Sequence, residues 1–409
     1  MAGGAKNDQS TTARTTGPPR TKVAVLLAID HPAQFRRAKV FGEALRPRFD
    51  VDVYVGFRRK GETLIHRWFE SVRLLRRVAK REYVAVHVLG LSFLLPPLLK
   101  VASRGRCRVV YDACNIQVGV METLGRGRVV RGIVRTLEEI SVRSADMVVA
   151  CGVTFAEYFA KHQGRTEGVR FVPDPVDVSK YPGARSTPEP LGAPGSSAGP
   201  LKVVYTSTFE TILVGGRSKP RGWELIEALS SPNDSPSSAI AIDFVGSGGA
   251  LGELKDLAMA RGLAPNCKFC GFLSPEEFVN EVSSADIGFM EDYDTLGYRY
   301  SVGSKVQEYM AAGLPVITSN APEKRYMLEE QAIGELLFPP MSVRDPRGEA
   351  GYLEDLRKSL RYAADHRAEI RAAGIRNRSR AERTFGVPVV ESLLRAVYDE
   401  LVPPADHRR

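Results

Sequence analysis

One cation and one carboxylate stand a helical turn apart in residues 304–317, which read SKVQEYMAAGLPVI. Lys305 and Glu308 are three residues apart, so on a helix both side chains project from the same face of the first turn. The free N–H groups and the dipole at this end of a helix favour a phosphate. Gly313 and Pro315 predict that the helix ends and an extended strand follows. The stretch therefore predicts a site for a phosphate and for hydroxyl groups, and a capped helix leading into a buried strand is the alternative.

This stretch closely resembles the nucleotide-binding signature of family 4 type glycosyltransferases with the GT-B fold, in the branch that reads Lys-x-x-Glu-Tyr-Met-Ala-x-Gly-Leu-Pro-Val-Ile. The resemblance covers nearly everything from Thr21 to Leu401. It implies that Lys305 meets the diphosphate of a nucleotide sugar and that Glu308 takes the ribose hydroxyls. It also implies a retaining transferase of α/β class, with two Rossmann-like doubly wound domains that face each other across a cleft, and no cofactor beyond the donor substrate.

Further segments resemble other parts of that family's donor site. The basic residue of the pair Arg221-Gly222 is expected to reach the diphosphate. Arg221 and Lys305 could then stabilise a leaving diphosphate without a metal, and none is predicted. The segment from Glu291 to Asp294 is interpreted as a solvated loop, not as a metal site. The other positions expected to bind the donor are Ser207, Gly246, Phe272, Leu273, Gly303 and Ser304.

Two departures from the family pattern concern the rest of the cleft. Many members carry a glutamate eight residues before the ribose-binding one, where this chain has Tyr300. Residues 110–115 resemble a stretch that ends in Asp-x-His in relatives, and Cys114 stands at the histidine position. The residues expected to line the acceptor side are Asp112, Cys114 and Asn115. Asp112 and His31 are candidate catalytic residues, although a turn histidine that caps the following helix is the alternative for His31.

Apolar runs alternate with helical patterns along the chain, as a parallel α/β sheet requires. The strands expected in the first half are 22–28, 51–55, 84–89, 108–111 and 146–150, and those in the second are 202–205, 242–245, 267–269, 287–289 and 315–317. The last helices are expected at 353–372 and 387–401. We predict a disordered tail at 1–20, an acceptor-side domain at 21–182, a linker at 183–200, a nucleotide-sugar domain at 201–385, and a segment at 386–409 that returns to the first domain, as the resemblance implies.

Composition limits the classes of protein to which the chain can belong. Of the 409 residues 43% are hydrophobic and 26% are charged, which is typical of a globular protein. We expect no transmembrane helix, because every apolar run is short. Residues 1–20 lack the apolar core of a secretory signal, which favours a cytosolic location. Five cysteines, an odd number, fit free buried thiols, and the lone C-x-x-C of Cys267 and Cys270 does not predict a zinc site.

The positive charge lies in the first half of the chain. Residues 1–180 hold 31 Lys and Arg against 17 Asp and Glu, a net of +14, and the remainder holds 26 against 31, or −5, which gives the total of +9. The densest segment, 58–81, combines arginines, lysine and Trp68 with an apolar face. Such a helix suits the surface of an anionic membrane, and an ordinary solvated helix face is the alternative. No nucleic-acid motif accompanies the charge, so nucleic acid is not a predicted partner.

Together these features predict a metal-independent, retaining glycosyltransferase that moves a sugar from a nucleotide diphosphate to a glycan or lipid-linked acceptor, at the inner membrane face. A nucleotide-sugar 2-epimerase of the same architecture is one alternative, against which the absent histidine at position 114 counts. The other is a non-catalytic nucleotide-sugar-binding subunit of a glycan assembly complex, suggested by Cys114 and Tyr300.

Overall fold

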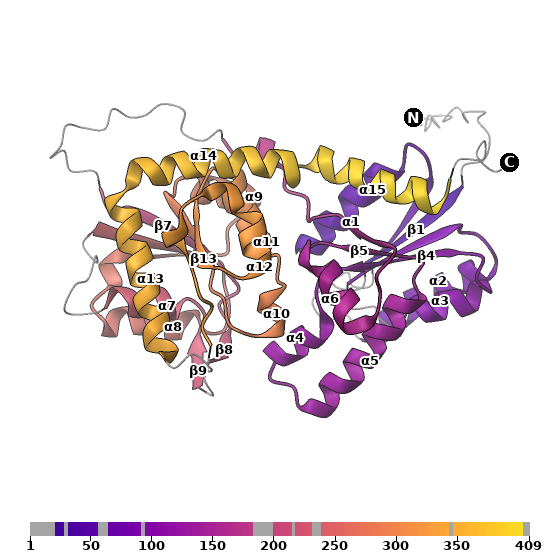
Figure 1. Ribbon diagram of the computed structural model, residues 1–409, viewed down its shortest axis with the longest axis horizontal. Coiled ribbons are helices and arrows are strands. Elements are labelled where there is room, and N and C mark those ends of the chain that lie inside the picture. Colours follow the sequence, from indigo (N-terminus) through magenta and orange to yellow (C-terminus); the bar gives the residue numbers. More distant parts are fainter. Residues whose placement is uncertain are drawn as a thin grey trace, which may run out of the picture.

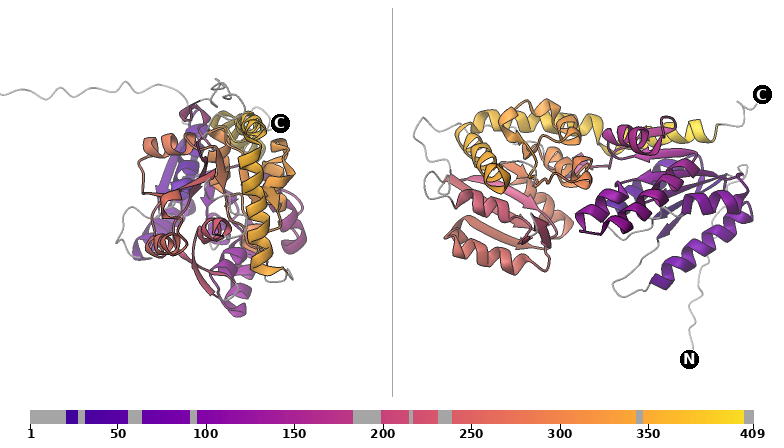
Figure 2. Two further views of the ribbon diagram at one scale, coloured as in Figure 1. Left: turned by 90° about the vertical axis from the view of Figure 1, so that its left-hand side faces the viewer. Right: turned by 60° about the horizontal axis from the view of Figure 1, so that its bottom comes forward.

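A computed structural model of the chain describes residues 21–27, 32–55, 64–90, 95–182, 199–214, 217–230, 239–342 and 347–403 (Figure 1). It contains two six-stranded sheets, one from each half of the chain, and the strands within each sheet are parallel. The two sheets lie side by side in Figure 1, and the last two helices run along the top of both, as the right-hand view of Figure 2 also shows. The predicted tail at 1–20, nearly all of the predicted linker and His31 lie outside the described residues.

The first domain has the strand order β2-β1-β3-β4-β5-β6. Its strands are β1 (Lys22–Leu27), β2 (Asp50–Val55), β3 (Ala85–Leu89), β4 (Arg108–Ala113), β5 (Met147–Ala150) and β6 (Val169–Phe171). Its helices are α1 (Pro32–Leu45), α2 (Leu64–Ala79), α3 (Leu95–Ser103), α4 (Gln117–Thr123), α5 (Arg128–Ser144) and α6 (Thr154–Gln163). Every residue of β3 is buried, as expected of a parallel strand covered by helices on both faces.

The second domain has the strand order β11-β10-β7-β12-β13-β14. Its strands are β7 (Leu201–Thr206), β10 (Ile240–Val245), β11 (Cys267–Gly271), β12 (Ile287–Phe289), β13 (Val316–Ser319) and β14 (Leu337–Phe338). The helices are α7 (Trp223–Leu229), α8 (Leu251–Ala260), α9 (Pro275–Ser283), α10 (Leu296–Arg299), α11 (Ser304–Ala311), α12 (Pro322–Met327) and α13 (Gly348–Asp365). An antiparallel hairpin, β8 (Thr211–Val214) and β9 (Arg217–Pro220), was not predicted.

The C-terminal helices join the two domains. The prediction of one helix over 353–372 is wrong, because α13 ends at Asp365 and α14 (Arg367–Thr384) begins beyond a break at His366, whose ring stacks on Tyr362. Helix α14 packs on α11 of the second domain, and α15 (Val387–Leu401) packs on α1 of the first. The apolar side of α15 closes the core of the first domain with Val390, Leu394, Val397 and Tyr398.

The two domains also touch directly at α4 and α10. A Cβ atom on Gly119 would lie 2.6 Å from the backbone nitrogen of Gly297, so both positions need glycine for this close approach. The backbone N–H of Leu296 donates to the Glu122 carboxylate at 2.8 Å. On another side, the Glu323 carboxylate of α12 accepts from the backbone N–H of Thr154 at 3.0 Å, at the first residue of α6. The domains are therefore held together by polar contacts as well as by α15.

Candidate active site

The predicted phosphate-binding helix lies at the carboxyl edge of the second sheet. Strand β7 lies between β10 and β12, which makes this edge the switch point where open α/β sheets bind ligands. Helix α11 begins at Ser304, directly after Gly303, which has a φ of 62°. A Cβ atom on Gly288 of β12 would lie 2.4 Å from the ring of Tyr309. Glycine at 288 therefore lets α11 pack closely on β12, which places Lys305 and Glu308 beside the switch point.

Two cations from different segments converge on one buried carboxylate. The Nζ of Lys305 lies 3.2 Å from one oxygen of Glu291, and Nη1 of Arg221 lies 3.8 Å from the other. Lys305 and Arg221 keep 18% and 25% of their side chains exposed, whereas Glu291 keeps 2%. The Lys305 ammonium also lies 4.7 Å from the ring centre of Tyr205, a cation–π contact. The structure thus brings together the two residues that the sequence predicted for the diphosphate.

Burial and charge oppose each other in this cluster. Burial alone would raise the pKa of Glu291, but the charges of Lys305 and Arg221 hold it below its usual value. Burial lowers the pKa of Lys305, and Glu291 counteracts this. A neighbouring carboxyl group, Glu224, is fully buried, and burial followed by repulsion from Glu291 raises its pKa to about 7. An anion that enters the cluster would stabilise the ammonium of Lys305.

The interpretation of Glu291 to Asp294 as a solvated loop is wrong for its first three residues, because Tyr293 is buried as well. Glu291 and Asp292 are 2% and 1% exposed. They follow β12 after a single residue, Met290, so the chain carries them into the packed carboxyl edge of the sheet. Asp292 lies 3.7 Å from the Lys324 ammonium, and burial raises the pKa of Asp292 to about 6. Glu291 is the site residue that the sequence interpretation missed, and its position just after a parallel strand was the signal that could have found it.

Glu308, the carboxylate expected to bind ribose, forms an ion pair across the cleft. Its Oε1 lies 3.0 Å from Nη1 of Arg36, which belongs to α1 of the first domain. Burial raises the pKa of Glu308, and the charge of Arg36 counteracts this. Arg36 was not predicted, because its partner is 272 residues away in sequence. In this structure Arg36 therefore occupies one oxygen of the carboxylate that is expected to bind ribose.

The glycine turn after β10 packs tightly against the loop after β7. A Cβ atom on Gly246, whose φ is 133°, would lie 1.9 Å from the carbonyl oxygen of Ser207. The loop holding Ser207 therefore reaches the site only because position 246 has no side chain. Phe272 is 84% exposed, at the carboxyl end of β11, and Leu273 packs against the core beside α11. The geometry thus places Ser207 and Gly246 together and leaves Phe272 on the rim.

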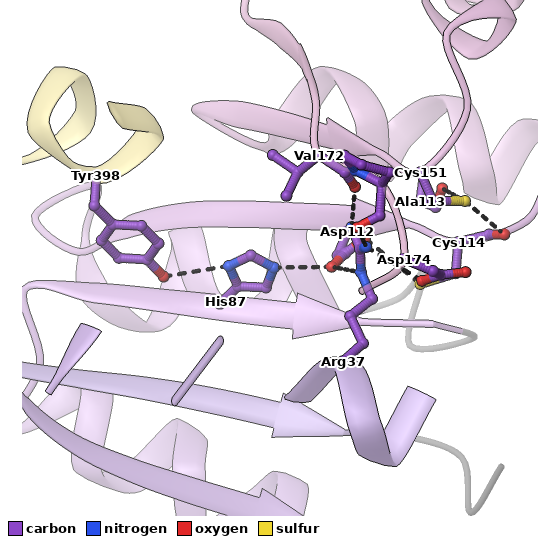
Figure 3. Close-up of polar contacts among 10 residues, drawn as sticks. Arg37, His87, Asp112, Ala113, Cys114, Cys151, Val172, Asp174 and Tyr398 are labelled. Atoms are coloured by element: carbon purple, nitrogen blue, oxygen red, sulfur yellow. Dashed lines mark hydrogen bonds and ion pairs between the residues drawn. The ribbon is translucent and has the colours of Figure 1, made fainter. Parts of the chain in front are cut away.

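Asp112, one of the predicted catalytic residues, is buried in a network within the first domain (Figure 3). Its two oxygens accept from Nε of Arg37 at 2.8 Å and from Nη2 at 3.1 Å. Nε2 of His87 lies 3.1 Å from the same carboxylate, and Nδ1 lies 3.3 Å from the hydroxyl of Tyr398. Burial would raise the pKa of Asp112, but Arg37 and His87 hold it below its usual value. The structure argues against a catalytic role for Asp112, because its side chain is fully buried.

The other residues predicted for the acceptor side differ in exposure. Asn115 is exposed and Cys114 is half-buried, with its thiol 3.5 Å from Asp112. Burial, together with the charge of Asp112, raises the pKa of Cys114 well above its usual value, so the thiol is no base at neutral pH. Tyr300, which replaces a glutamate of the family pattern, packs on Tyr158 of the first domain with ring centres 5.3 Å apart. Tyr300 is therefore part of the interdomain contact.

Helix α10 connects the cation pair to the first domain. The hydroxyl of Tyr298 lies 3.4 Å from Nη2 of Arg221, while Leu296 and Gly297 on the same helix contact α4. The Nε of Arg221 is buried and has no hydrogen-bond partner among the described residues. Arg221 therefore retains hydrogen-bonding capacity for a ligand, and α10 fixes the position of Arg221 relative to the first domain.

Two α/β domains, each built on a parallel sheet, match the architecture of solved GT-B glycosyltransferase structures. Residues 217–361, which contain Arg221, Lys305 and Glu308, match the model of the family described as glycosyl transferases group 1. The match and the fold together support the glycosyltransferase class.

Solved structures share the fold over nearly the whole chain. HepE from Anabaena in complex with UDP is 14% identical, with a TM-score of 0.64, and the match covers 93% of this chain and 100% of HepE. Sucrose-phosphate synthase from Thermosynechococcus elongatus is 16% identical, with a TM-score of 0.68, and the match covers 93% and 99%. WaaG, a glycosyltransferase involved in lipopolysaccharide biosynthesis, is 16% identical, with a TM-score of 0.59, and the match covers 93% and 100%. The predicted GT-B fold is confirmed, and no curated protein matches the chain in sequence.

Proposed function

We propose that this chain is a retaining, metal-independent glycosyltransferase that moves a sugar from a nucleoside diphosphate donor to a glycan or lipid-linked acceptor. The observation that carries the proposal is the convergence of Arg221 and Lys305 on Glu291, one helical turn from Glu308. Two cations can stabilise a diphosphate, and a carboxylate can accept two hydroxyl hydrogens from ribose. The group 1 family match over these residues supports the same assignment.

The proposed chemistry depends on positive charge placed where negative charge develops during the reaction. The bond between the anomeric carbon and the diphosphate oxygen breaks, and Arg221 and Lys305 neutralise the departing diphosphate. The acceptor oxygen bonds to the anomeric carbon on the face that the diphosphate leaves, and a phosphate oxygen takes the acceptor's proton. Because a phosphate oxygen serves as the base, this route needs neither Asp112 nor Cys114. Glu291 acts as a positioning residue that holds the two cations together before the donor arrives.

Solved structures with a similar fold guide our proposal for the nucleotide base of the donor. HepE has been solved with UDP and with UDP-glucose, and WaaG is involved in lipopolysaccharide biosynthesis. We propose that the donor is a sugar nucleotide of uridine diphosphate, and that the acceptor is a glycan or is carried on a lipid. Within the described ranges every helix is too short or too polar to be a candidate membrane span. Any association with an anionic inner membrane face would therefore involve the surface of these ranges or a segment outside them.

Thermal shift with uridine, guanosine, adenosine and thymidine diphosphates tests the donor site directly. A ligand at a hundred times its dissociation constant stabilises a protein by about 2.7 kcal/mol, so one nucleotide should stand out. Lys305→Ala and Arg221→Ala should each weaken its binding roughly ten- to hundred-fold, as expected for hydrogen bonds to a charged group. Glu308→Gln should weaken the nucleotide but leave inorganic pyrophosphate unchanged, because pyrophosphate has no ribose. Lys358→Ala is the matched control, since that side chain is 69% exposed on α13.

Turnover assays separate the proposal from its alternatives. Transfer with the same anomeric configuration as the donor, insensitive to a chelator, is the expected result. Donor binding without transfer to any acceptor would favour a non-catalytic subunit, and isomerisation of the donor sugar would favour a 2-epimerase. If Lys305→Ala and Arg221→Ala both bind pyrophosphate as the wild type does, the cation pair is not the diphosphate site.

A further inference from the structure

The second domain contains a hollow of about 280 Å³ that the donor site does not use. Its lining comes from the segment after β12, from α10 and from the start of α12, and it includes Asp292, Asp294, Arg299, Asn320 and Arg325. None of the residues expected to contact the donor is part of this lining. The volume lies just below the range of roughly 300–1,000 Å³ that holds drug-sized ligands, so the hollow suits a molecule of the size of one sugar ring.

Asp292 brings to the hollow a buried carboxylate that has one oxygen without a partner. The residue is 1% exposed. Its Oδ2 accepts from the hydroxyl of Ser319 and lies 3.7 Å from the ammonium of Lys324. Its Oδ1 is buried and has no hydrogen-bond partner among the described residues. Because a buried polar atom without a partner is costly, a ligand hydroxyl in the hollow would stabilise this carboxylate.

The chain directs two neighbouring carboxylates to different partners. Glu291 pairs with Lys305 of α11, whereas Asp292 lies beside Lys324 of α12. The segment continues β12 and forms a parallel bridge at Tyr293, and successive side chains of an extended chain point to opposite sides. The hollow therefore lies across this segment from the cation pair. A ligand in the hollow leaves the diphosphate site free.

The charges around the hollow balance. Its lining contains two carboxylates, Asp292 and Asp294, and two guanidinium groups, Arg299 and Arg325. Asp294 is paired with Arg299 at 3.1 Å, whereas Arg325 is exposed and forms no ion pair within the described ranges. The two carboxylates would repel a phosphate, and the two arginines would repel a metal cation. A neutral ligand that carries several hydroxyl groups meets neither penalty.

We propose that this hollow binds one neutral sugar ring of a glycan, and we call it the Asp292 subsite, after the residue that lines it with Asn320 and Arg325. The hydroxyl groups of a sugar both donate and accept, so a sugar site needs both kinds of partner. Oδ1 of Asp292 accepts, the guanidinium of Arg325 donates, and the amide of the exposed Asn320 does both. Pro322 and Pro340 complete the lining with apolar surface for the C–H groups of the ring.

The Asp292 subsite lies where the second domain meets the first. Figure 1 shows α10 and α12, which carry Arg299 and Arg325, on the side of the second domain that faces the first. Helix α10 contacts α4, and Glu323 of α12 accepts from the backbone of Thr154 in α6. One consequence rests on the proposed function: a glycan acceptor long enough to reach the subsite should have a lower KM than a short one, at equal kcat. Equal KM values would overturn this consequence but not the binding.

Saturation-transfer NMR on the full chain tests binding without turnover. The probes are the methyl glycosides of glucose, galactose, mannose and N-acetylglucosamine, each titrated without and with excess UDP or inorganic phosphate. We expect at least one probe to bind with a roughly millimolar dissociation constant, and neither UDP nor phosphate to displace it. Asn320→Ala combined with Arg325→Ala should weaken that binding at least roughly ten-fold, because a hydrogen bond from a charged group is lost. Asp292 is left in place, because its removal would leave Lys324 buried without its ion-pair partner.

Asn280→Ala combined with Arg371→Ala is the matched control, because both side chains are exposed, on α9 and α14, and neither lines the hollow. Circular dichroism checks that every variant is folded. The proposal is overturned if no probe binds, if UDP or phosphate displaces the probe, or if the Asn320 and Arg325 double variant binds it as the control does. Lys305→Ala separates the subsite from the donor site, since this variant should lose UDP and keep the probe. A wild type that binds the probe but not UDP would contradict the proposed donor and support the subsite.

Discussion

Each domain buries a carboxylate at the carboxyl edge of its sheet that is paired with an arginine. In the first domain Asp112 pairs with Arg37 and His87, and all three are fully buried. In the second domain Glu291 pairs with Lys305 and Arg221, which stay partly exposed. The residue types are nearly the same, yet one cluster is closed and the other open. The difference shows that accessibility of the cation, more than the presence of a paired carboxylate, distinguishes a binding site from a structural ion pair.

The arginines differ in how fully their donors are used. Arg37 donates to both oxygens of Asp112, to the carbonyl oxygens of Val172 and Pro173 and to Asp174. Arg221 has a 3.8 Å ion pair with Glu291, a 3.4 Å contact with Tyr298 and an Nε without a partner among the described residues. Arg37 therefore holds loops together, whereas Arg221 has donors left for a phosphate.

The largest effect is expected when Arg37 is replaced. Arg37→Met leaves Asp112 buried with only the His87 ring and the Cys114 thiol in contact, and it should destabilise the protein by about 3–5 kcal/mol, as breaking a buried ion pair does. Arg221→Met should cost much less stability, because the side chain is partly exposed. Urea denaturation measures both. Equal losses of stability for the two variants would contradict the comparison.

A second measurement sharpens the same contrast. The folded fraction of Arg37→Met should bind nucleoside diphosphate as the wild type does, since Arg37 does not reach the cleft. Arg221→Met should lose that binding. Replacing Asp112 by Leu in the Arg37→Met background should recover part of the stability, because the fully buried Asp112 then leaves no unpaired charge. If the double variant is no more stable than Arg37→Met, then the unpaired Asp112 is not the source of the loss.

The sequence predicted local features better than distant ones. Lys305 and Glu308 could be found because their spacing on one helix is itself the signal. Glu291 was missed because its burial depends on strands that are far apart in the chain, and Arg36 because it comes from the other domain. Asp112 was placed in the cleft by resemblance, while the residues that bury it come from α1, β3 and α15. The sheets were predictable because apolar runs mark parallel strands. Which residues at the edge of a sheet stay accessible was not predictable, because packing between distant elements decides it.

The next largest expected effect is a dependence of stability on pH, and it comes from Glu138, a buried carboxyl group without a full charge partner. Burial raises the pKa of Glu138 from 4.5 to about 7, although the Gln117 backbone and the Gln163 side chain donate to it. Between these two values the unfolded chain has released the proton and the folded chain still binds it, so stability falls as pH rises through this window. At about pH 8 the loss from this group is on the order of 3 kcal/mol relative to about pH 4.

Glu138→Gln should remove that part of the pH dependence. The glutamine can still accept from the backbone of Gln117, and its amide can donate to the Gln163 side-chain oxygen, which has no partner among the described residues. The variant should therefore match the wild type at acid pH and exceed it above neutral pH, measured by urea denaturation across pH. Glu139→Gln, a change at the adjacent residue, whose side chain is paired with Arg143, is the control and should keep the wild-type slope. A wild-type slope in Glu138→Gln would show that this carboxyl group ionises normally in the folded protein.

The smallest effect concerns the ion pair between Arg36 and Glu308, which joins the first domain to the second. Arg36 is 45% exposed and its pair with Glu308 should contribute about 0.2–1 kcal/mol, so removing it frees the ribose carboxylate at little cost. Arg36→Gln should then bind nucleoside diphosphate up to roughly five-fold more tightly by calorimetry, while inorganic pyrophosphate binds unchanged. The measurement is repeated at increasing pH, because burial raises the pKa of Glu308 and loss of Arg36 raises it further. Arg106→Gln, an exposed arginine of the same domain, is the control. Weaker nucleotide binding by Arg36→Gln would make Arg36 a donor contact, and the open cluster would then extend into the first domain.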